Sequence, residues 1–95
     1  MTEKTRRWDP ARYLETDQDV AEFIDAVLED GDPAVVAEAI GVVARARGMS
    51  QLARDSGLTC EGLYRALNRE GNPEFATIMK VLGALGVRLR ATKAA

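Results

Sequence analysis

Apolar residues recur at helical spacing in the stretch between residues 18 and 29. They lie at positions i, i+3, i+4, i+7 and i+8 and are Val20, Phe23, Ile24, Val27 and Leu28. Acidic residues occupy the other face, so the pattern predicts an amphipathic helix with one face on a core. Thr16 or Asp17 is a suitable N-cap, and Gly31 marks the end of the helix.

Two further helices are predicted by the same spacing and by a shared start signal. An Asp or Asn followed by proline stands at 32–33 and at 72–73, and this pair is typical of an N-cap and first helical position. The helix after 32–33 ends near Gly48, and its apolar stripe is Val36, Ala39, Ile40, Val43 and Ala44. The helix over residues 74–85 is expected to bury Phe75, Ile78, Met79, Leu82 and Leu85.

The segment 50–68 has the pattern of two short helices joined by a tight turn. Ser50 is the expected N-cap of the first helix, Gly57 suits a turn with positive φ, and Thr59 is the expected N-cap of the second helix. The apolar positions that would hold the pair together are Leu52, Ala53, Leu58, Leu63 and Leu67. Such a pair is typical of the helix-turn-helix unit, whose second helix enters the DNA major groove; the alternative is a generic helical hairpin.

Residues 87–91 alternate apolar and polar side chains, which predicts a short strand. One strand needs a partner, which could be a second subunit, the N-terminal arm or another protein; otherwise the segment is a loose tail. The fold class expected from all these patterns is all-α, a five-helix bundle with a short C-terminal strand. Residues 1–16 form an N-terminal arm, and residues 17–95 form one helical domain with the helix-turn-helix at 50–68.

The amino-acid composition excludes several kinds of functional site. The chain has 95 residues, one cysteine and no histidine, so zinc sites, internal disulfides and histidine-based acid–base catalysis are nearly excluded. No acid–base pair is specified by spacing, and we expect no enzyme activity, cofactor or metal. No apolar run approaches membrane-spanning length and no secretory leader precedes the domain, which favours a cytoplasmic protein without a membrane partner.

The charge is distributed unevenly along the chain. The net charge is −2, but residues 1–32 carry ten acids and four bases, net −6, and residues 33–95 carry five acids and nine bases, net +4. An acidic first third and a basic remainder suggest two surfaces with different partners, although solvated helix faces alone would also give this pattern.

Four pieces of the chain resemble one protein family. They are WDPARYL at 8–14, VLEDGDP at 27–33, VARARGMSQLARDSGL at 43–58 and LYRALNREGNPEFATIMKVLGALGVRL at 63–89. Together they resemble the addiction-module antidote proteins, the HigA-like antitoxins with a Cro/repressor-type (Xre-like) DNA-binding domain. The resemblance implies a lambda-repressor-like helix-turn-helix and a small basic mRNA-cleaving toxin of the HigB/RelE type as partner. It also implies that the protein represses its own operon.

The helix-turn-helix interpretation assigns a DNA-contacting set on the outer face of the second helix and beside it. The candidates are Ser50, Gln51, Thr59, Cys60, Glu61, Tyr64, Arg65, Asn68, Arg69 and Asn72. Arg65 is the best candidate for a bidentate contact to guanine. Glu61 could accept from cytosine or simply stabilise the helix start, and Tyr64 could reach DNA or cover the core. Because one such domain buries little area, we expect a homodimer on an inverted-repeat operator in double-stranded DNA.

A second set is assigned to the toxin. The acidic candidates are Asp19, Glu22, Asp25 and Glu29, which would attract a basic partner. Trp8 and Tyr13 could anchor the partner or only seal the arm to the body. We expect the apolar stripe of the acidic helix to be covered by the core, so that charge dominates recognition there. The sequence therefore predicts a DNA-binding antitoxin; the alternatives are a transcriptional regulator without a toxin partner and a protein-interaction module without DNA binding.

Overall fold

The structure is a computed structural model that describes residues 16–94, and these residues form five α-helices and no strand. The helices are α1 (Asp17–Asp30), α2 (Pro33–Arg47), α3 (Met49–Ser56), α4 (Cys60–Ala66) and α5 (Phe75–Ala84). The expectation of an all-helical chain with five helices is confirmed. Trp8 and Tyr13 lie outside the described residues.

The first two helices begin at the predicted caps. The Thr16 hydroxyl accepts from the Asp19 backbone N–H at 3.0 Å, and the Asp19 carboxylate accepts from the Thr16 N–H at 3.2 Å. This reciprocal pair is a capping box. Asp32 accepts from the Ala34 N–H at 3.0 Å, with Pro33 at the first helical position. Both starts are local signals, so the sequence alone identifies them.

Two predicted helix starts are wrong. Ser50 is not an N-cap, because α3 begins at Met49 with Gly48 as its N-cap. Gly48 has φ of 103°, a conformation that lets the chain turn directly from α2 into α3. Met49, the first residue of α3, is buried. Asn72 is not a cap either: it has φ of 46° and belongs to a loop, and Glu74 is the N-cap of α5.

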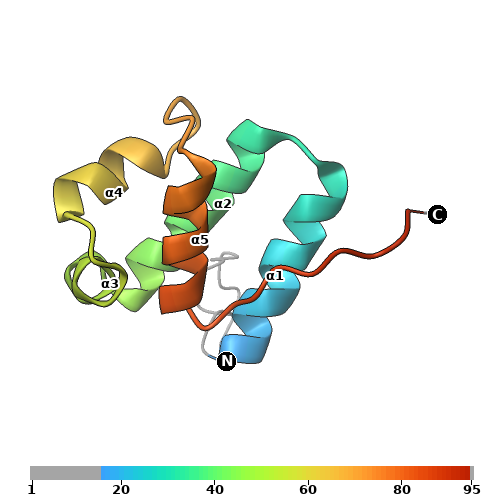
Figure 1. Ribbon diagram of the computed structural model, residues 1–95, viewed down its shortest axis with the longest axis horizontal. Coiled ribbons are helices and arrows are strands. Elements are labelled where there is room, and N and C mark those ends of the chain that lie inside the picture. Colours follow the sequence, from blue (N-terminus) through green and yellow to red (C-terminus); the bar gives the residue numbers. More distant parts are fainter. Residues whose placement is uncertain (1–15, 95) are drawn as a thin grey trace, which may run out of the picture.

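One hydrophobic core contains side chains from all five helices. Its buried members are Val20, Ile24, Ile40, Val43, Ala44, Met49, Leu52, Ala53, Leu63, Leu67, Val81, Leu82 and Leu85. α1 packs against α2, and α3 packs against α2, α4 and α5. In Figure 1, α1 lies at one end of the molecule, α2 and α5 in the middle, and α3 with α4 at the other end.

Part of the predicted core is exposed to solvent. Phe75 is 70% exposed, Met79 46% and Leu28 40%. The apolar surface of α5 is wider than the surface that its neighbours cover. Leu82 and Leu85 are buried as predicted, together with Val81, while Phe75 and Met79 stay exposed. Periodicity identifies an apolar face but does not say how much of it another helix covers.

The predicted C-terminal strand is not formed within the described residues. Residues 87–94 have no regular secondary structure, although Val87 and Leu89 are partly buried against the core. A strand needs a neighbouring strand for its backbone hydrogen bonds, and residues 16–94 offer none. Packing of the C-terminal tail against the helices of the same chain therefore explains why apolar residues alternate with polar ones in this segment.

Gly41 in the middle of α2 allows a close approach of two backbone segments in the core. A Cβ atom at this position would lie 2.4 Å from the carbonyl oxygen of Leu67, just after α4. A backbone oxygen cannot move aside as the end of a flexible side chain can. The absence of a side chain at Gly41 therefore sets the distance between α2 and the end of α4.

We predict that Gly41→Ala lowers the free energy of unfolding by about 2 kcal/mol, because the clash outweighs the better helix propensity of alanine. Gly83→Ala is the matched control in another helix, since a Cβ there meets no atom within 4 Å. It should raise the free energy of unfolding by about 0.5–1 kcal/mol. Urea unfolding measures the change in the free energy of unfolding for each variant. Equal changes in the two would contradict the close contact between Gly41 and Leu67.

Candidate functional site

The α3–α4 unit is joined by a turn at Gly57. Gly57 has φ of 77°, as the sequence predicts, and the Leu58 N–H donates to the Ala53 carbonyl at 3.1 Å. α4 is held to the body by Leu63 and Leu67, each with no exposed surface. The inner face of α4 is thereby fixed, and its other side chains are left on the outside.

Thr59 starts α4 as predicted. Its hydroxyl accepts from the Gly62 backbone N–H at 2.9 Å. A Cβ atom on Gly62 would lie only 2.9 Å from that hydroxyl oxygen. Glycine is a poor helix former, but at position 62 the absence of a side chain leaves room for the cap.

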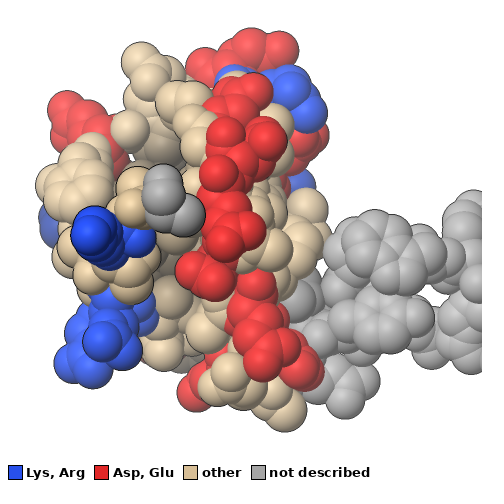
Figure 2. Space-filling model, turned by 90° about the vertical axis from the view of Figure 1, so that its right-hand side faces the viewer, with Lys and Arg blue, Asp and Glu red and all other residues tan. Residues whose placement is uncertain are grey.

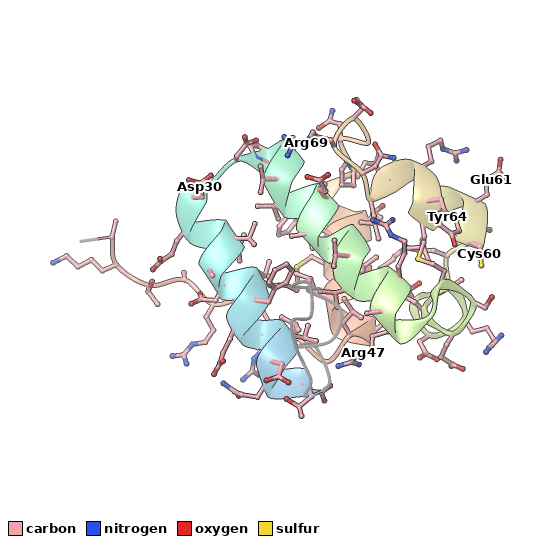
Figure 3. All side chains as sticks on the ribbon, turned by 180° about the vertical axis from the view of Figure 1, so that it is seen from behind. Asp30, Arg47, Cys60, Glu61, Tyr64 and Arg69 are labelled. Atoms are coloured by element: carbon pink, nitrogen blue, oxygen red, sulfur yellow. The ribbon has the colours of Figure 1, made fainter. Side chains whose placement is uncertain are left out.

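The outer face of α4 carries polar and aromatic side chains. In Figure 3, Cys60, Glu61 and Tyr64 extend from α4 on the side away from α1. Tyr64 is 53% exposed, so its ring does not serve mainly to cover the core. The Arg65 guanidinium lies 3.9 Å from the Glu61 carboxylate, and both side chains are exposed. Such a pair is worth little in water, so both groups are able to reach a partner.

The predicted DNA set divides into smaller groups in space. The Cys60 thiol donates to the Ser50 hydroxyl at 3.9 Å, which links the starts of α3 and α4. Gln51 is engaged within α3, where its side chain donates to Asp55 at 2.8 Å. Thr59, Arg65 and Asn72 line one shallow hollow beside α4.

Asn68 and Arg69, both in the predicted DNA set, also have partners within the protein. The Asn68 side-chain amide donates to the carbonyls of Tyr64 and Arg65 at 2.9 and 3.0 Å and so satisfies the end of α4. The Arg69 guanidinium forms a 2.9 Å ion pair with Glu38 of α2. An amide residue directly after a short helix is a local signal that could have identified the first role; the second depends on tertiary packing.

The acidic side chains of α1 form a stripe on the opposite end of the molecule. Figure 2 shows these red side chains running along one face. Glu22, Asp25, Glu29 and Asp30 are exposed; we call these four residues the acidic stripe. Asp19 is part of the capping box, so its carboxylate is already engaged. Within residues 16–94, the ion pair formed by an α1 carboxylate joins Asp17 to Arg47 at 2.8 Å.

The described part of the chain has neither a metal-binding cluster nor a membrane-spanning helix. Residues 16–94 contain no group of three or more His, Cys, Asp or Glu side chains placed to hold a metal ion. None of the five described helices combines the length and apolar character that crossing a membrane requires.

Comparison with known proteins identifies the family. Residues 4–93 match the family described as "Probable addiction module antidote protein". This chain belongs to that family. A protein of uncharacterised function from Haemophilus influenzae is 41% identical over 90 residues, which cover 95% of this chain and 93% of the relative. No solved structure matches the chain significantly.

The family is one of probable antidotes of addiction modules, so membership supports an antitoxin and implies, in general, a toxin as its partner. The antitoxin thus carries two surfaces that differ in charge: the exposed side of α4, with one acid and one base, and the acidic stripe of α1. They lie on different helices at different ends of the molecule (Figure 1).

We predict that Thr59→Ala lowers the free energy of unfolding of the antitoxin by about 1 kcal/mol, because the Gly62 N–H loses its acceptor. Thr59→Ser keeps a hydroxyl at the cap and should stay within about 0.3 kcal/mol of the unmodified protein. Thermal unfolding followed by circular dichroism distinguishes the two variants. Equal loss in both would mean that the threonine methyl, and not the cap, matters.

Proposed function

We propose that this antitoxin is a DNA-binding autorepressor that neutralises a small, basic, mRNA-cleaving toxin of the HigB/RelE type. The observation that carries the DNA part of the proposal is the outer face of α4. It presents Glu61, Tyr64 and Arg65 to solvent while Leu63 and Leu67 fix the helix from behind. This is what a recognition helix needs: a rigid inner face and free polar groups outside.

The α3–turn–α4 arrangement supports a lambda-repressor-like helix-turn-helix. α3 packs on α4, α2 and α5 and so acts as the support of the second helix. The Ser50 hydroxyl and the backbone N–H groups at the start of α3 are available to phosphates, and Arg65 is available to a guanine edge. One such domain contacts few base pairs, so the proposal includes a homodimer on an inverted repeat with half-sites about one helical turn apart.

The acidic stripe supports the toxin part of the proposal. An enzyme that binds and cleaves RNA must hold phosphates, which requires a basic surface. The carboxylates of the stripe would attract that surface at long range and compete with RNA for it. Neutralisation then follows from occupation of the surface on which the toxin holds its substrate.

We predict that Arg65→Ala weakens binding to DNA from upstream of the gene by about 1–3 kcal/mol and relaxes the preference at one base pair. Lys93→Ala is the matched control, because it removes the same charge from the C-terminal tail, away from α4. It should change affinity by less than about 0.5 kcal/mol. Gel-shift titration measures both. Unchanged affinity of the Arg65 variant would mean that α4 is not the recognition helix.

We predict that Glu22→Gln combined with Glu29→Gln slows association with the toxin about tenfold at low salt, with the difference disappearing at high salt. Asp55→Asn combined with Glu61→Gln removes the same two charges from α3 and α4 and should leave the rate within about twofold. Asp19 is left intact because its substitution would unfold the start of α1. Stopped-flow measurements at several salt concentrations give the association rates of both double variants. Equal rates for the two would exclude the acidic stripe as the surface that attracts the toxin.

Failure of the unmodified protein to shift DNA from upstream of its gene would favour the interaction module without DNA binding. Binding to that DNA without a toxin in the neighbouring reading frame would favour a transcriptional regulator of the same fold. The two observations together separate the three candidate functions.

A further inference from the structure

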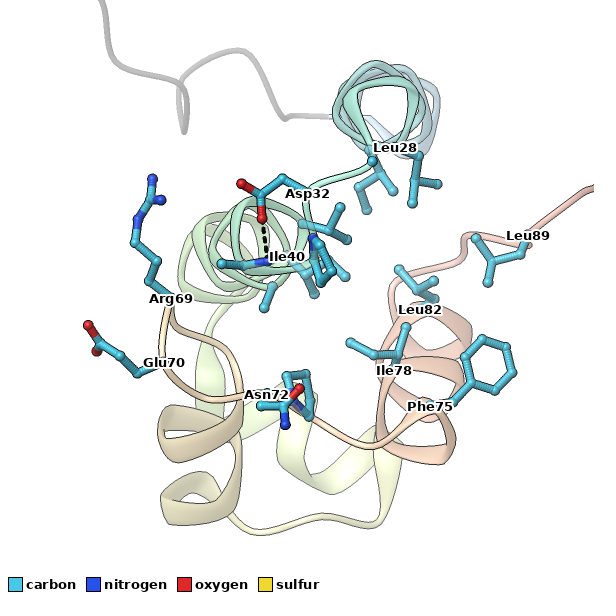
Figure 4. Close-up of a pocket in the computed structure, with 17 residues that line it drawn as sticks. Leu28, Asp32, Ile40, Arg69, Glu70, Asn72, Phe75, Ile78, Leu82 and Leu89 are labelled. Atoms are coloured by element: carbon cyan, nitrogen blue, oxygen red, sulfur yellow. Dashed lines mark hydrogen bonds between the residues drawn. The ribbon is translucent and has the colours of Figure 1, made fainter. Parts of the chain in front are cut away.

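A groove opens between α1, the start of α2, the loop before α5, and α5 itself (Figure 4). Its volume is about 580 Å³. Ile40 and Leu82, both buried, are among its lining residues. Leu28, Phe75, Ile78 and Leu89 also line it and come from α1, from α5 and from the C-terminal tail. The groove is therefore apolar and is built from parts of the chain that the five-helix core holds in place.

The groove leaves apolar surface uncovered that the sequence assigns to the core. Leu28 is 40% exposed and Phe75 is 70% exposed. The expectation that the core covers the apolar stripe of α1 is therefore wrong at its C-terminal end. Exposed aromatic and aliphatic side chains around one concave surface are typical of a protein interaction site.

Charge at the border of the groove indicates what would fill it. Asp25 and Glu29 of the acidic stripe directly follow the groove-lining residues Ile24 and Leu28 along α1. Three charged residues line the groove itself: Asp32 at the start of α2, and Arg69 and Glu70 after α4, of which Arg69 is already paired with Glu38. A matching occupant has apolar side chains that enter the groove and Lys or Arg side chains that lie over its acidic border.

We propose that this groove is the anchoring site of the toxin, and that it receives a segment of the toxin in which apolar side chains are bordered by basic ones. The inference rests on the proposed toxin partner and adds a short-range apolar contact to the long-range attraction of the acidic stripe. A second copy of this chain is a weaker candidate. Its basic tail has the right character, but Leu89 of that tail already lines the groove of its own copy.

The position of the groove is compatible with DNA binding. It runs from α1 to the loop before α5, and its lining includes Arg69 and Asn72 of the candidate DNA-contacting set but no residue of α4. A toxin segment in the groove would leave Glu61, Tyr64 and Arg65 accessible.

The test uses Phe75→Ala and Leu28→Ala, which remove apolar surface from the groove without changing charge. Met79→Ala is the matched control, because Met79 is also apolar, 46% exposed and on α5, but does not line the groove. The probe is the small basic protein encoded by the adjacent reading frame, made inactive by substitution and immobilised for binding kinetics. Circular dichroism of each variant verifies that the helices remain folded.

We expect each groove variant to raise the dissociation rate about tenfold or more at every salt concentration, as for loss of a buried anchor. The association rate should be unchanged, and Met79→Ala should stay within about twofold in both rates. This signature differs from that of the stripe variants, which act on association and only at low salt.

Dissociation rates of both groove variants within about twofold of the unmodified protein would overturn the inference and leave the proposed function standing. Conversion of the isolated antitoxin from dimer to monomer by Phe75→Ala, with toxin dissociation unchanged, would assign the groove to a second copy and also overturn it. If the unmodified antitoxin does not bind the probe at all, the proposed function fails and the inference fails with it.

Discussion

The seven residues of α4 are too few to form a stable helix in water, so everything that the outer face of α4 does depends on how its inner face is held. Leu63 and Leu67 supply that support, since both are fully buried in the core. Gly41 lets the backbone of α2 come close to Leu67, which makes the contact between the two helices tight. The orientation of Arg65 and Tyr64 is thus set by three apolar positions that never reach solvent.

Much of the fold follows from local signals in the sequence. Thr16, Asp32 and Thr59 each cap the helix that the sequence assigns to them, because an N-cap hydrogen bond involves only the next two or three residues. The apolar positions of α3 and α4 are also correctly assigned to the core. These assignments are correct because both helices are short and only one face of each carries apolar residues.

The remaining features depend on parts of the chain that are distant in sequence. Phe75 lies on an apolar face of α5, but no pattern within α5 reveals that its neighbours end before they cover it. The alternation in residues 87–91 is real, yet a strand requires a partner that residues 16–94 do not contain. The sequence predicts that Arg69 contacts DNA, whereas in the structure its guanidinium forms an ion pair with Glu38. The groove could not be predicted because it belongs to no single element.

The separation of charge in space removes the apparent conflict between a net charge of −2 and binding to DNA. Fixed charges in solution act over a Debye length of about 8 Å at physiological salt. In Figure 1, α2 and α5 lie between α1 and α4, and a single helix-packing distance of about 8–10 Å already matches the Debye length. The acidic stripe is therefore screened from a duplex that contacts α4. DNA would experience mainly the charges of α3, α4 and the following loop, where three bases and four acids between residues 49 and 74 nearly balance. A basic partner would experience mainly the charges of α1. A chain with almost balanced charge can in this way present an acidic surface to a basic partner and a nearly neutral surface to DNA, provided that the helices between them keep the two surfaces apart.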